Sequence, residues 1–396
     1  MKIAISTICP HIYFEGRWWS YEPFVLEMNV WGQLFDELIM IAPVEQGPAP
    51  AFWAPYDDST NVSLVPYRRD KGRGLKQSRS SVLEVPTMVY SIVKAVRRAQ
   101  AVHVRCPGSI GLVSALLVPL LGRRMCAKYA GQWGRYPGEA RSVRLQRAIL
   151  RSAWWRGPVT VYGRNPTDPE KIVSFFTSSL SPDNLARAKA AAAKKTKQNA
   201  LRVLYVGRLS AAKNTELLVS AVALLRSRQV PIECLIVGDG PERQALETQV
   251  SRENLSMSIT FTGGRAFSEV LSCYEKADVL VLMSQTEGWP KVIAEAMAFG
   301  LVCIASEQGV IPEMLGNGRG IVIPPGSVEA LADALQEISA RPEEFESMRL
   351  RAALWAGQYS LENLRDALKD LLSSYWGMPF DDSLQKVKMQ PADFNA

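Results

Sequence analysis

The sequence predicts an α/β protein built from two doubly wound units, each a parallel sheet covered by helices. Short β-branched runs alternate along the chain with stretches whose apolar residues recur at helical spacing. This alternation stops at residues 181–200 and begins again at Leu201. The chain has 396 residues, more than one hydrophobic core usually serves. We therefore expect two domains.

The first unit opens with the strand "KIAIST", a helical stretch over residues 21–35 and the buried strand "ELIMIAPV". This β-α-β order indicates a parallel sheet. Further strands are expected at 62–67, 102–107, 123–131 and 158–163, and helices at 87–100, 110–121 and 141–155.

The segment 181–200 is rich in Ala and Lys and has no large apolar face, which is typical of a connection between domains. A second unit follows it. Its strands are expected at 201–207, 232–240, 258–264, 278–284, 302–306 and 320–326, and its helices at 214–228, 241–254, 267–277, 290–300, 327–340, 342–356 and 361–376. The predicted parts are 1–180, the linker 181–200, 201–358, a last helix within 359–380 and a polar tail, 381–396.

Composition excludes several classes of protein. The net charge is +7, but residues 1–200 carry 28 Lys and Arg against 14 Asp and Glu, whereas residues 201–396 carry 18 against 25. A basic N-terminal half favours a phosphate-bearing ligand or an anionic surface. The six Cys are scattered and only two His occur, which argues against disulfides and a His-built metal site. With no bilayer-length apolar run and no signal peptide, we expect a cytoplasmic protein.

The turn "VGRLSAAKN" follows the strand that ends at Val206. Gly207 permits a tight turn, and Arg208 and Lys213 then project from the carboxyl end of the sheet, where α/β folds bind ligands. Two cations there would suit a diphosphate, although a purely structural role is equally open. The later turn "VGDGPER" fits architecture better than chemistry.

The stretch "TEGWPKVIAEAMAFGL" (residues 286–301) places Glu287 in a Gly/Pro turn and Glu295 inside a helix. The free N–H groups of a helix N-terminus attract anions, so a phosphate is expected near Gly288, Trp289 and Pro290. Glu295 would lie on an apolar face, where a carboxylate is costly unless bonded. A ribose diol or a surface Lys or Arg would satisfy it. Glu287 would either reach a sugar hydroxyl or cap the helix.

Taken together, these motifs resemble the family 4 glycosyltransferases, whose signature is two Glu separated by seven residues. "GRLSAAKN" is similar to the family's Gly-Arg turn, and "VGDGPER" to its Gly-x-Gly-Pro turn. The resemblance covers residues 200–360 well and the N-terminal half loosely.

This resemblance implies the GT-B fold: two Rossmann-like domains facing a central cleft, an acceptor-binding N-terminal domain, a donor-binding C-terminal domain and a last helix that crosses back. It implies retaining sugar transfer from a nucleoside-diphosphate sugar, with no metal and no other cofactor. Arg208 and Lys213 match the phosphate-neutralising pair. Glu287 would hold the donor sugar, Glu295 the ribose, and the backbone of residues 288–290 the phosphate.

The N-terminal half departs from the family pattern, so the acceptor side is open. A Gly-rich loop is replaced by "CPHIYFEGRWWSYEP", and a His-containing turn by "YAGQWGRYPG". Candidate acceptor-binding residues are His103, Arg105, Gln132 and Trp133. His103 would line the cleft or be a bonded structural residue. Trp133 would stack on a sugar or fill the gap between the domains.

The acceptor would be a glycan or a lipid-linked or polysaccharide intermediate. Residues 141–157 combine five Arg with Trp154 and Trp155, which suits either contact with an anionic membrane at its inner face or an ordinary amphipathic helix. A nucleotide-sugar-binding protein without transfer is the main alternative, and a sugar epimerase is a weaker one. No nucleic-acid-binding module and no G-x-G-x-x-G turn occur.

Overall fold

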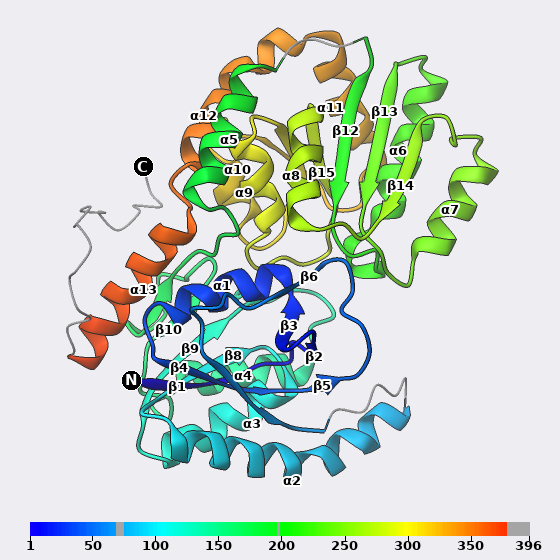
Figure 1. Cartoon of the computed structure of the whole chain (residues 1–396). Helices are drawn as coiled ribbons and strands as arrows, with labels where there is room; N and C mark the ends of the chain where they lie inside the picture. Colours follow the sequence, from blue (N-terminus) through cyan, green and yellow to red (C-terminus); the bar gives the residue numbers. More distant parts are fainter. Residues whose placement is uncertain (69–74, 196–198, 378–396) are drawn as a thin grey trace.

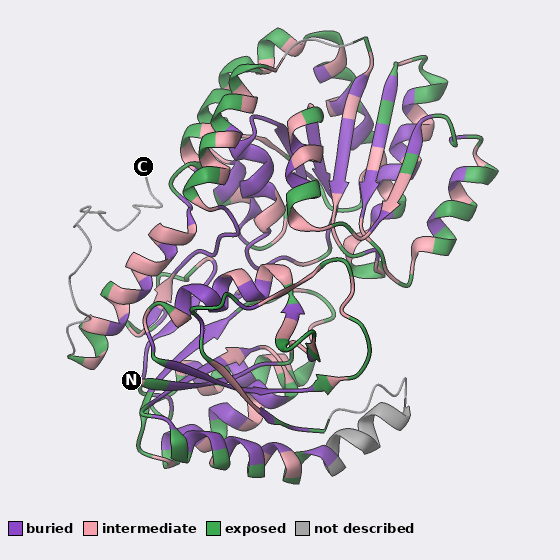
Figure 2. Cartoon of the chain, in the orientation of Figure 1, coloured by how far each residue is buried: buried purple, intermediate pink, exposed green. Residues whose placement is uncertain are grey.

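A computed structural model describes residues 1–68, 75–195 and 199–377 (Figure 1). The predicted polar tail, 381–396, lies outside these residues. Two parallel sheets form the cores of two domains stacked one above the other, and β12 and β14 of the upper domain point toward the lower domain. The strands of the upper domain's sheet are mostly buried, with exposed positions on β13 (Ile232–Val237) and β14 (Ile259–Gly263) (Figure 2). Within the described residues, no helix is both long and apolar enough to cross a membrane.

The N-terminal sheet is parallel and buried on both faces, which explains its continuous apolar strands. Its order is β11 (Ile172–Ser174), β10 (Val159–Val161), β9 (Arg124–Tyr129), β8 (Ala101–Cys106), β1 (Lys2–Ser6), β4 (Glu37–Ala42) and β7 (Val62–Pro66). One face packs on α2 (Leu75–Arg98), α3 (Ser109–Leu117) and α4 (Arg141–Arg151), and the other on α1 (Glu22–Gly32). Helix α3 ends at Leu117 and is followed by a short 3-10 turn, η1 (Val118–Leu120), which contains Pro119.

The C-terminal sheet is also parallel and repeats the doubly wound pattern. Its order is β14 (Ile259–Gly263), β13 (Ile232–Val237), β12 (Leu201–Val206), β15 (Val279–Leu282), β16 (Val302–Ser306) and β17 (Ile321–Ile323). Its helices are η2 (Ala211–Lys213), α6 (Thr215–Ser227), α7 (Arg243–Arg252), α8 (Phe267–Lys276), α9 (Lys291–Ala298), α10 (Ile311–Leu315), α11 (Val328–Ala340), η3 (Pro342–Phe345) and α12 (Glu346–Ala356).

A small third sheet occupies the place where the sequence suggested only a loop. Its order is β5 (Val44–Glu45), β2 (His11–Phe14), β3 (Arg17–Tyr21) and β6 (Trp53–Pro55). Strands β2 and β3 form an antiparallel hairpin closed by Glu15 and Gly16, whose φ angles are 51° and 77°. Positive φ at both central residues is typical of the tight turn that matches strand twist. The aromatic residues on both sides of this turn supply the β propensity.

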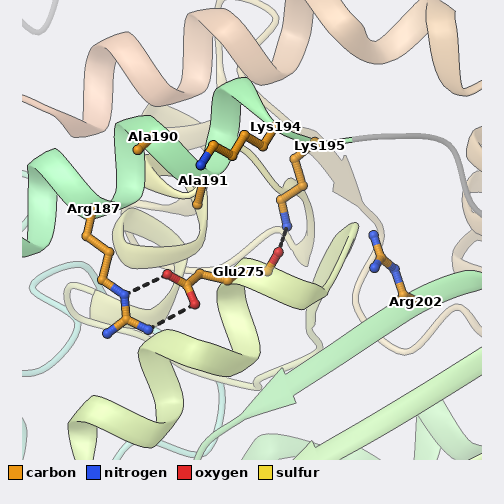
Figure 3. A pocket seen from close by; sticks show the side chains of 7 residues that line it. All are labelled: Arg187, Ala190, Ala191, Lys194, Lys195, Arg202 and Glu275. Atoms are coloured by element: carbon orange, nitrogen blue, oxygen red, sulfur yellow. Dashed lines mark hydrogen bonds and ion pairs between the residues drawn. The ribbon is translucent and has the colours of Figure 1, made fainter.

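The predicted linker contains helix α5 (Pro182–Ala193), which packs on α8 and α9. Arg187 pairs with Glu275 at 2.6 Å, and the ammonium of Lys195 donates to the carbonyls of Tyr274 and Glu275 (Figure 3). These groups line a cavity of about 350 Å³. Its charges are largely paired within the chain, which indicates that they attach α5 to the C-terminal domain.

The last helix, α13 (Leu361–Trp376), returns to the N-terminal domain (Figure 1). At the crossing, the Leu361 N–H donates to the Leu180 carbonyl at 2.9 Å, and the Ser178 hydroxyl donates to the Tyr359 carbonyl at 2.7 Å. The ring of Trp376 lies 6.3 Å from that of Phe35. The two domains are thus joined by packed side chains as well as by the linker.

Because His11 in β2 is buried, we expect the stability of the folded protein to depend on pH. Its Nε2 lies 2.7 Å from the Tyr56 hydroxyl, and burial lowers the pKa of His11 from 6.5 to about 4. The folded state therefore binds fewer protons, so the stability from neutral His11 is complete above pH 6.5 and is lost as the pH falls toward 4. We expect a loss of about 3 kcal/mol from this group. Urea unfolding at pH 4, 5 and 6.5 should show a steeper decline for the wild type than for His11→Gln, and equal declines would refute the assignment.

Candidate functional site

Glu287 and Lys213 meet where the carboxyl ends of two neighbouring strands, β12 and β15, open into loops. Glu287 is 9% exposed, and one of its carboxylate oxygens accepts a hydrogen bond from the Lys213 ammonium. The two loops are tied together, because the Gln285 N–H donates to the Ala212 carbonyl at 2.9 Å and the Gln285 amide donates to Asn214 at 2.8 Å. The structure therefore holds a carboxylate and an ammonium within direct reach of each other.

Arg208 supplies a second cation beside this pair. It follows Gly207 directly after β12, and its side chain is exposed. In the described part of the chain, the Arg208 guanidinium has no ion pair or hydrogen bond. Gly207 is fixed by its N–H, which donates to the Val237 carbonyl at 3.0 Å. Arg208 is thus available to an anion at this edge of the sheet.

The turn after β13 is architectural, as the sequence suggested. A Cβ added at Gly238 would lie 1.9 Å from the Gly207 carbonyl oxygen, and one at Gly240 would lie 2.1 Å from that of Leu209. The two glycines therefore let the backbones of adjacent turns touch. This contact supports the position of the turn that carries Arg208.

Glu295 is buried inside the C-terminal domain and is 5% exposed. The Tyr274 hydroxyl of α8 donates to one of its oxygens at 2.8 Å. Burial raises the pKa of Glu295, and this hydrogen bond and the charge of Lys291 oppose the rise. Glu295 is thus hydrogen-bonded to a tyrosine within the core, in place of the surface cation that was one of the two alternatives. A role toward ribose stays a prediction.

Gly288 and Trp289 lie at the boundary between the two domains. A Cβ at Gly288 would lie 2.6 Å from the Ala130 carbonyl oxygen of the N-terminal domain. The close approach that Gly288 permits is therefore between domains. The Trp289 side chain is buried against the rings of Tyr162 and Tyr359, and a contact between the backbone of residues 288–290 and a donor phosphate stays a prediction. Pro290 caps α9 and is buried.

We expect Gly288→Ala to impair the protein by separating the domains. An added methyl group would overlap backbone at 2.6 Å, and a backbone neighbour cannot give way without moving its whole domain. A loss of about 1–3 kcal/mol in unfolding free energy is expected. Thermal denaturation measures this loss. The control is Gly326→Ala, where an added Cβ meets nothing within 4 Å. Because Gly326 has a φ of 80°, that variant reports the cost of losing glycine's conformational freedom without a steric overlap. Equal stability of Gly288→Ala and wild type would contradict the contact.

Three of the four acceptor candidates are engaged inside the N-terminal domain. Trp133 is buried, its indole N–H donates to Asp168 at 2.7 Å, and the Arg151 guanidinium lies 4.6 Å from its ring centroid. His103 is buried 4.3 Å from the ring of Trp31. Arg105 pairs with Glu27 at 2.6 Å. Core partners hold each of these side chains, which for His103 agrees with the alternative of a bonded structural residue. A contact with an acceptor stays a prediction.

Gln132, the fourth candidate, joins the two domains. Its amide oxygen accepts a hydrogen bond from Thr286 at 3.1 Å, next to Glu287. Two further hydrogen bonds cross the boundary. Lys291 donates to the Pro23 carbonyl at 2.8 Å, and the Phe267 N–H at the start of α8 donates to Glu22 at 2.9 Å. Gln132 is therefore the acceptor candidate that the structure brings next to Glu287.

The N-terminal domain contains a buried charge cluster that the sequence did not indicate. Glu27 of α1 accepts hydrogen bonds from Arg105 and from Thr177, and Lys128 of β9 lies 2.9 Å from it. Although burial opposes its charge, Arg105 and Lys128 hold the pKa of Glu27 well below its usual range. No sequence signal joins these residues, since they are 78 to 150 positions apart. One further cation, Lys291, could have been predicted from the sequence as a neighbour of Glu295, because it lies one helical turn before that residue.

Helix α4 packs on its own domain, which corrects part of the membrane hypothesis. Arg147 is buried against Glu139, Arg151 pairs with Asp168 at 2.7 Å, and Trp155 is fully buried. Exposed side chains on this segment include Arg141, Arg144, Leu145 and Trp154. Separately, no group of three His, Cys, Asp or Glu side chains gathers as metal ligands within the described ranges.

The sequence of the second domain matches a known family. Residues 187–355 match the family model described as "Glycosyl transferases group 1". The C-terminal domain is a group 1 glycosyltransferase domain. Relatives include the alpha-D-kanosaminyltransferase of Streptomyces kanamyceticus, which is 34% identical over 42% of this chain and 44% of that protein. A GDP-mannose-dependent phosphatidylinositol monomannoside mannosyltransferase of Mycobacterium tuberculosis is 29% identical over 50% of this chain and 53% of that protein. The chain thus spans about half the length of the curated relatives it matches.

Solved structures extend the likeness of the group 1 domain to the fold of nearly the whole chain. Sucrose-phosphate synthase of Thermosynechococcus elongatus matches with a TM-score of 0.71 and 19% identity, over 95% of this chain and 99% of that one. HepE of Anabaena, in complex with UDP and glucose, matches with a TM-score of 0.67 and 17% identity, over 94% and 100%. The chain therefore has the GT-B fold that the motifs implied.

Proposed function

We propose that the protein is a retaining, metal-independent glycosyltransferase that uses a nucleoside-diphosphate sugar. In this reaction the bond between the anomeric carbon and the diphosphate oxygen breaks, and the diphosphate leaves with the electron pair. The acceptor oxygen forms a bond to the anomeric carbon on the same face of the sugar and passes its proton to the departing diphosphate. The observation that carries the proposal is the Glu287–Lys213 pair beside exposed Arg208, at the carboxyl edge of a group 1 domain.

Each residue of this group has a role that fits its chemistry. Arg208 and Lys213 would offset the negative charge that grows on the departing diphosphate, the charge that a metal ion offsets in other enzymes. Glu287 would release Lys213 to the phosphates and accept hydrogen bonds from hydroxyls of the donor sugar. Glu295 would bind the ribose once its surroundings open. The N–H groups at the start of α9 would face the phosphates.

The acceptor is a glycan or a lipid-linked saccharide in this proposal. The relatives include an alpha-D-kanosaminyltransferase and a phosphatidylinositol monomannoside mannosyltransferase, so the sugars that they transfer differ, and the second acts on a lipid-linked saccharide. An anionic membrane surface would be met by the exposed residues of the α4 segment. A nucleotide-sugar-binding protein without transfer would keep the donor site and lack turnover.

A thermal-shift screen against UDP-, GDP- and ADP-sugars in the presence of EDTA tests the donor site. At a concentration 100-fold above the dissociation constant, a ligand stabilises the fold by about 2.7 kcal/mol. We expect one nucleotide to shift the wild type and to shift Glu295→Gln much less, because a ribose hydroxyl loses a charged acceptor. Glu329→Gln, at an exposed position of α11, should respond as the wild type does. No shift with any nucleotide, or an equal shift in Glu295→Gln, would contradict the proposal.

A further inference from the structure

The small sheet has one face rich in aromatic rings. In the ladder of β2, β3 and β6, Ile12 lies opposite Trp19, Phe14 opposite Arg17, and Tyr21 opposite Trp53. Paired residues point to the same side, and alternate residues along a strand share that side. We call this side the aromatic face, and its members are Ile12, Phe14, Arg17, Trp19, Tyr21 and Trp53.

The opposite face of the small sheet packs against the domain at the end that carries His11 and Ser20. His11 and Ser20 lie opposite each other there and are fully buried, with His11 against the rings of Phe24 and Tyr56. At the outer end of this packed face, Tyr13 is 60% exposed beside Trp18. On the aromatic face only Ile12 is buried, whereas three rings (Phe14, Trp19 and Trp53) are half-buried and Tyr21 is 46% exposed.

The rings of the aromatic face are held in place. The Trp19 indole N–H donates to the Phe14 carbonyl at 3.0 Å, and the two rings meet edge to face at 6.0 Å. The ring of Tyr21 lies 6.3 Å from that of Phe52. Rings that are fixed before binding lose little conformational entropy when a ligand arrives.

The aromatic face begins at the boundary between the domains and continues outward from the donor side. Phe52 lies against Gly264 of the C-terminal domain, where an added Cβ would be 2.8 Å from its ring. Tyr21 directly precedes Glu22, which accepts the hydrogen bond from the start of α8. Trp19 and Arg17 lie successively farther along β3, at about 7 Å per two residues.

We propose that the aromatic face binds a saccharide acceptor that extends over more than one sugar unit. This inference rests on the proposed function, since it gives the acceptor of that reaction a site. A pyranose has an apolar C–H face that stacks on aromatic rings and a rim of hydroxyls that needs hydrogen-bonding partners. The face offers both, because Arg17 lies opposite Phe14 and pairs with Asp58 at 2.8 Å, so charged groups stand beside the rings. Rings interspersed with charged groups suit a saccharide better than a lipid chain.

Binding of the full chain to a microarray of immobilised oligosaccharides tests the inference without knowledge of the donor. We expect the wild type to bind a subset of them and Trp19→Ala to bind that subset about tenfold more weakly, the equivalent of about 1.4 kcal/mol. Tyr13→Ala is the matched control, since it removes an exposed ring from the other face of the same hairpin. Phe14→Ala provides a second variant if Trp19→Ala does not fold.

The nucleotide screen on the same variants separates the two proposals. Trp19→Ala should keep the nucleotide-induced shift of the wild type, because its ring lies outside the donor site. If no nucleotide sugar shifts the melting temperature of the wild type or of any variant, the donor proposal is refuted. The acceptor role is then refuted with it, whatever the array shows. A normal shift with equal oligosaccharide binding by wild type and Trp19→Ala would overturn the aromatic-face inference alone. Wild-type binding only to vesicles of anionic phospholipid would overturn it as well.

Discussion

Glu287→Gln should lower the rate of sugar transfer by about 10²- to 10³-fold, while the protein keeps its fold. The substitution keeps the shape of the side chain but removes its charge, so Lys213 loses its ion-pair partner and the donor sugar loses a charged hydrogen-bond acceptor. Interactions that hold charge in place during the reaction are typically worth about 3–4 kcal/mol in a water-poor site. Because Glu287 is 9% exposed, its surroundings are of this kind.

The effect is measured as the rate of turnover of the nucleotide sugar found in the donor screen. This rate is monitored through the release of the nucleoside diphosphate. Glu216→Gln is a suitable control, since Glu216 is an exposed carboxylate in the first turn of α6, three residues after Lys213. It should react at the wild-type rate. Full activity of Glu287→Gln would remove Glu287 from the catalytic group, and a fall in thermal stability that accounts for the loss would assign it a structural role.

The sequence was most informative where function depends on local spacing. The turn with Arg208 and Lys213 and the stretch with Glu287 and Glu295 each lie at the end of a strand, and the carboxyl ends of neighbouring parallel strands meet at one edge. Strand order then brings Lys213 to Glu287. The sequence therefore predicts that both motifs lie at this edge, but the strand order that makes β12 and β15 neighbours is seen only in the fold.

The N-terminal half was harder to interpret because its side chains are satisfied by distant partners. Trp133 and Arg105 have the chemistry of ligand-binding residues, but Asp168 and Glu27 hold them in the core. The hairpin over residues 11–21 was also missed, because its turn residues are Glu-Gly where Asn-Gly or Asp-Gly would have given a clear signal. Local pattern cannot reveal pairings that only the folded chain creates.

Among the substitutions proposed for this protein, Glu27→Gln should lower the unfolding free energy most. Removing the carboxylate leaves two buried cations without a counter-charge, and breaking a buried pair in this way costs about 3–5 kcal/mol. Lys128 can escape part of this cost, because burial already lowers its pKa to about 7 and it can lose its proton. Arg105 cannot, since a guanidinium stays charged in proteins. The cost should therefore fall mainly on Arg105.

Thermal and urea unfolding of single and double variants tests this division. We expect Glu27→Gln to lower the melting temperature by roughly 10 °C. Glu337→Gln, which breaks an exposed pair with Arg341, should change the unfolding free energy by less than about 1 kcal/mol. If Arg105 bears the cost, then Glu27→Gln with Arg105→Met should be less destabilised than the sum of the two single variants, because the double variant no longer buries an unpaired guanidinium. Additive effects would show instead that Glu27 stabilises the fold through its packing against β8 and β9 rather than through its charge.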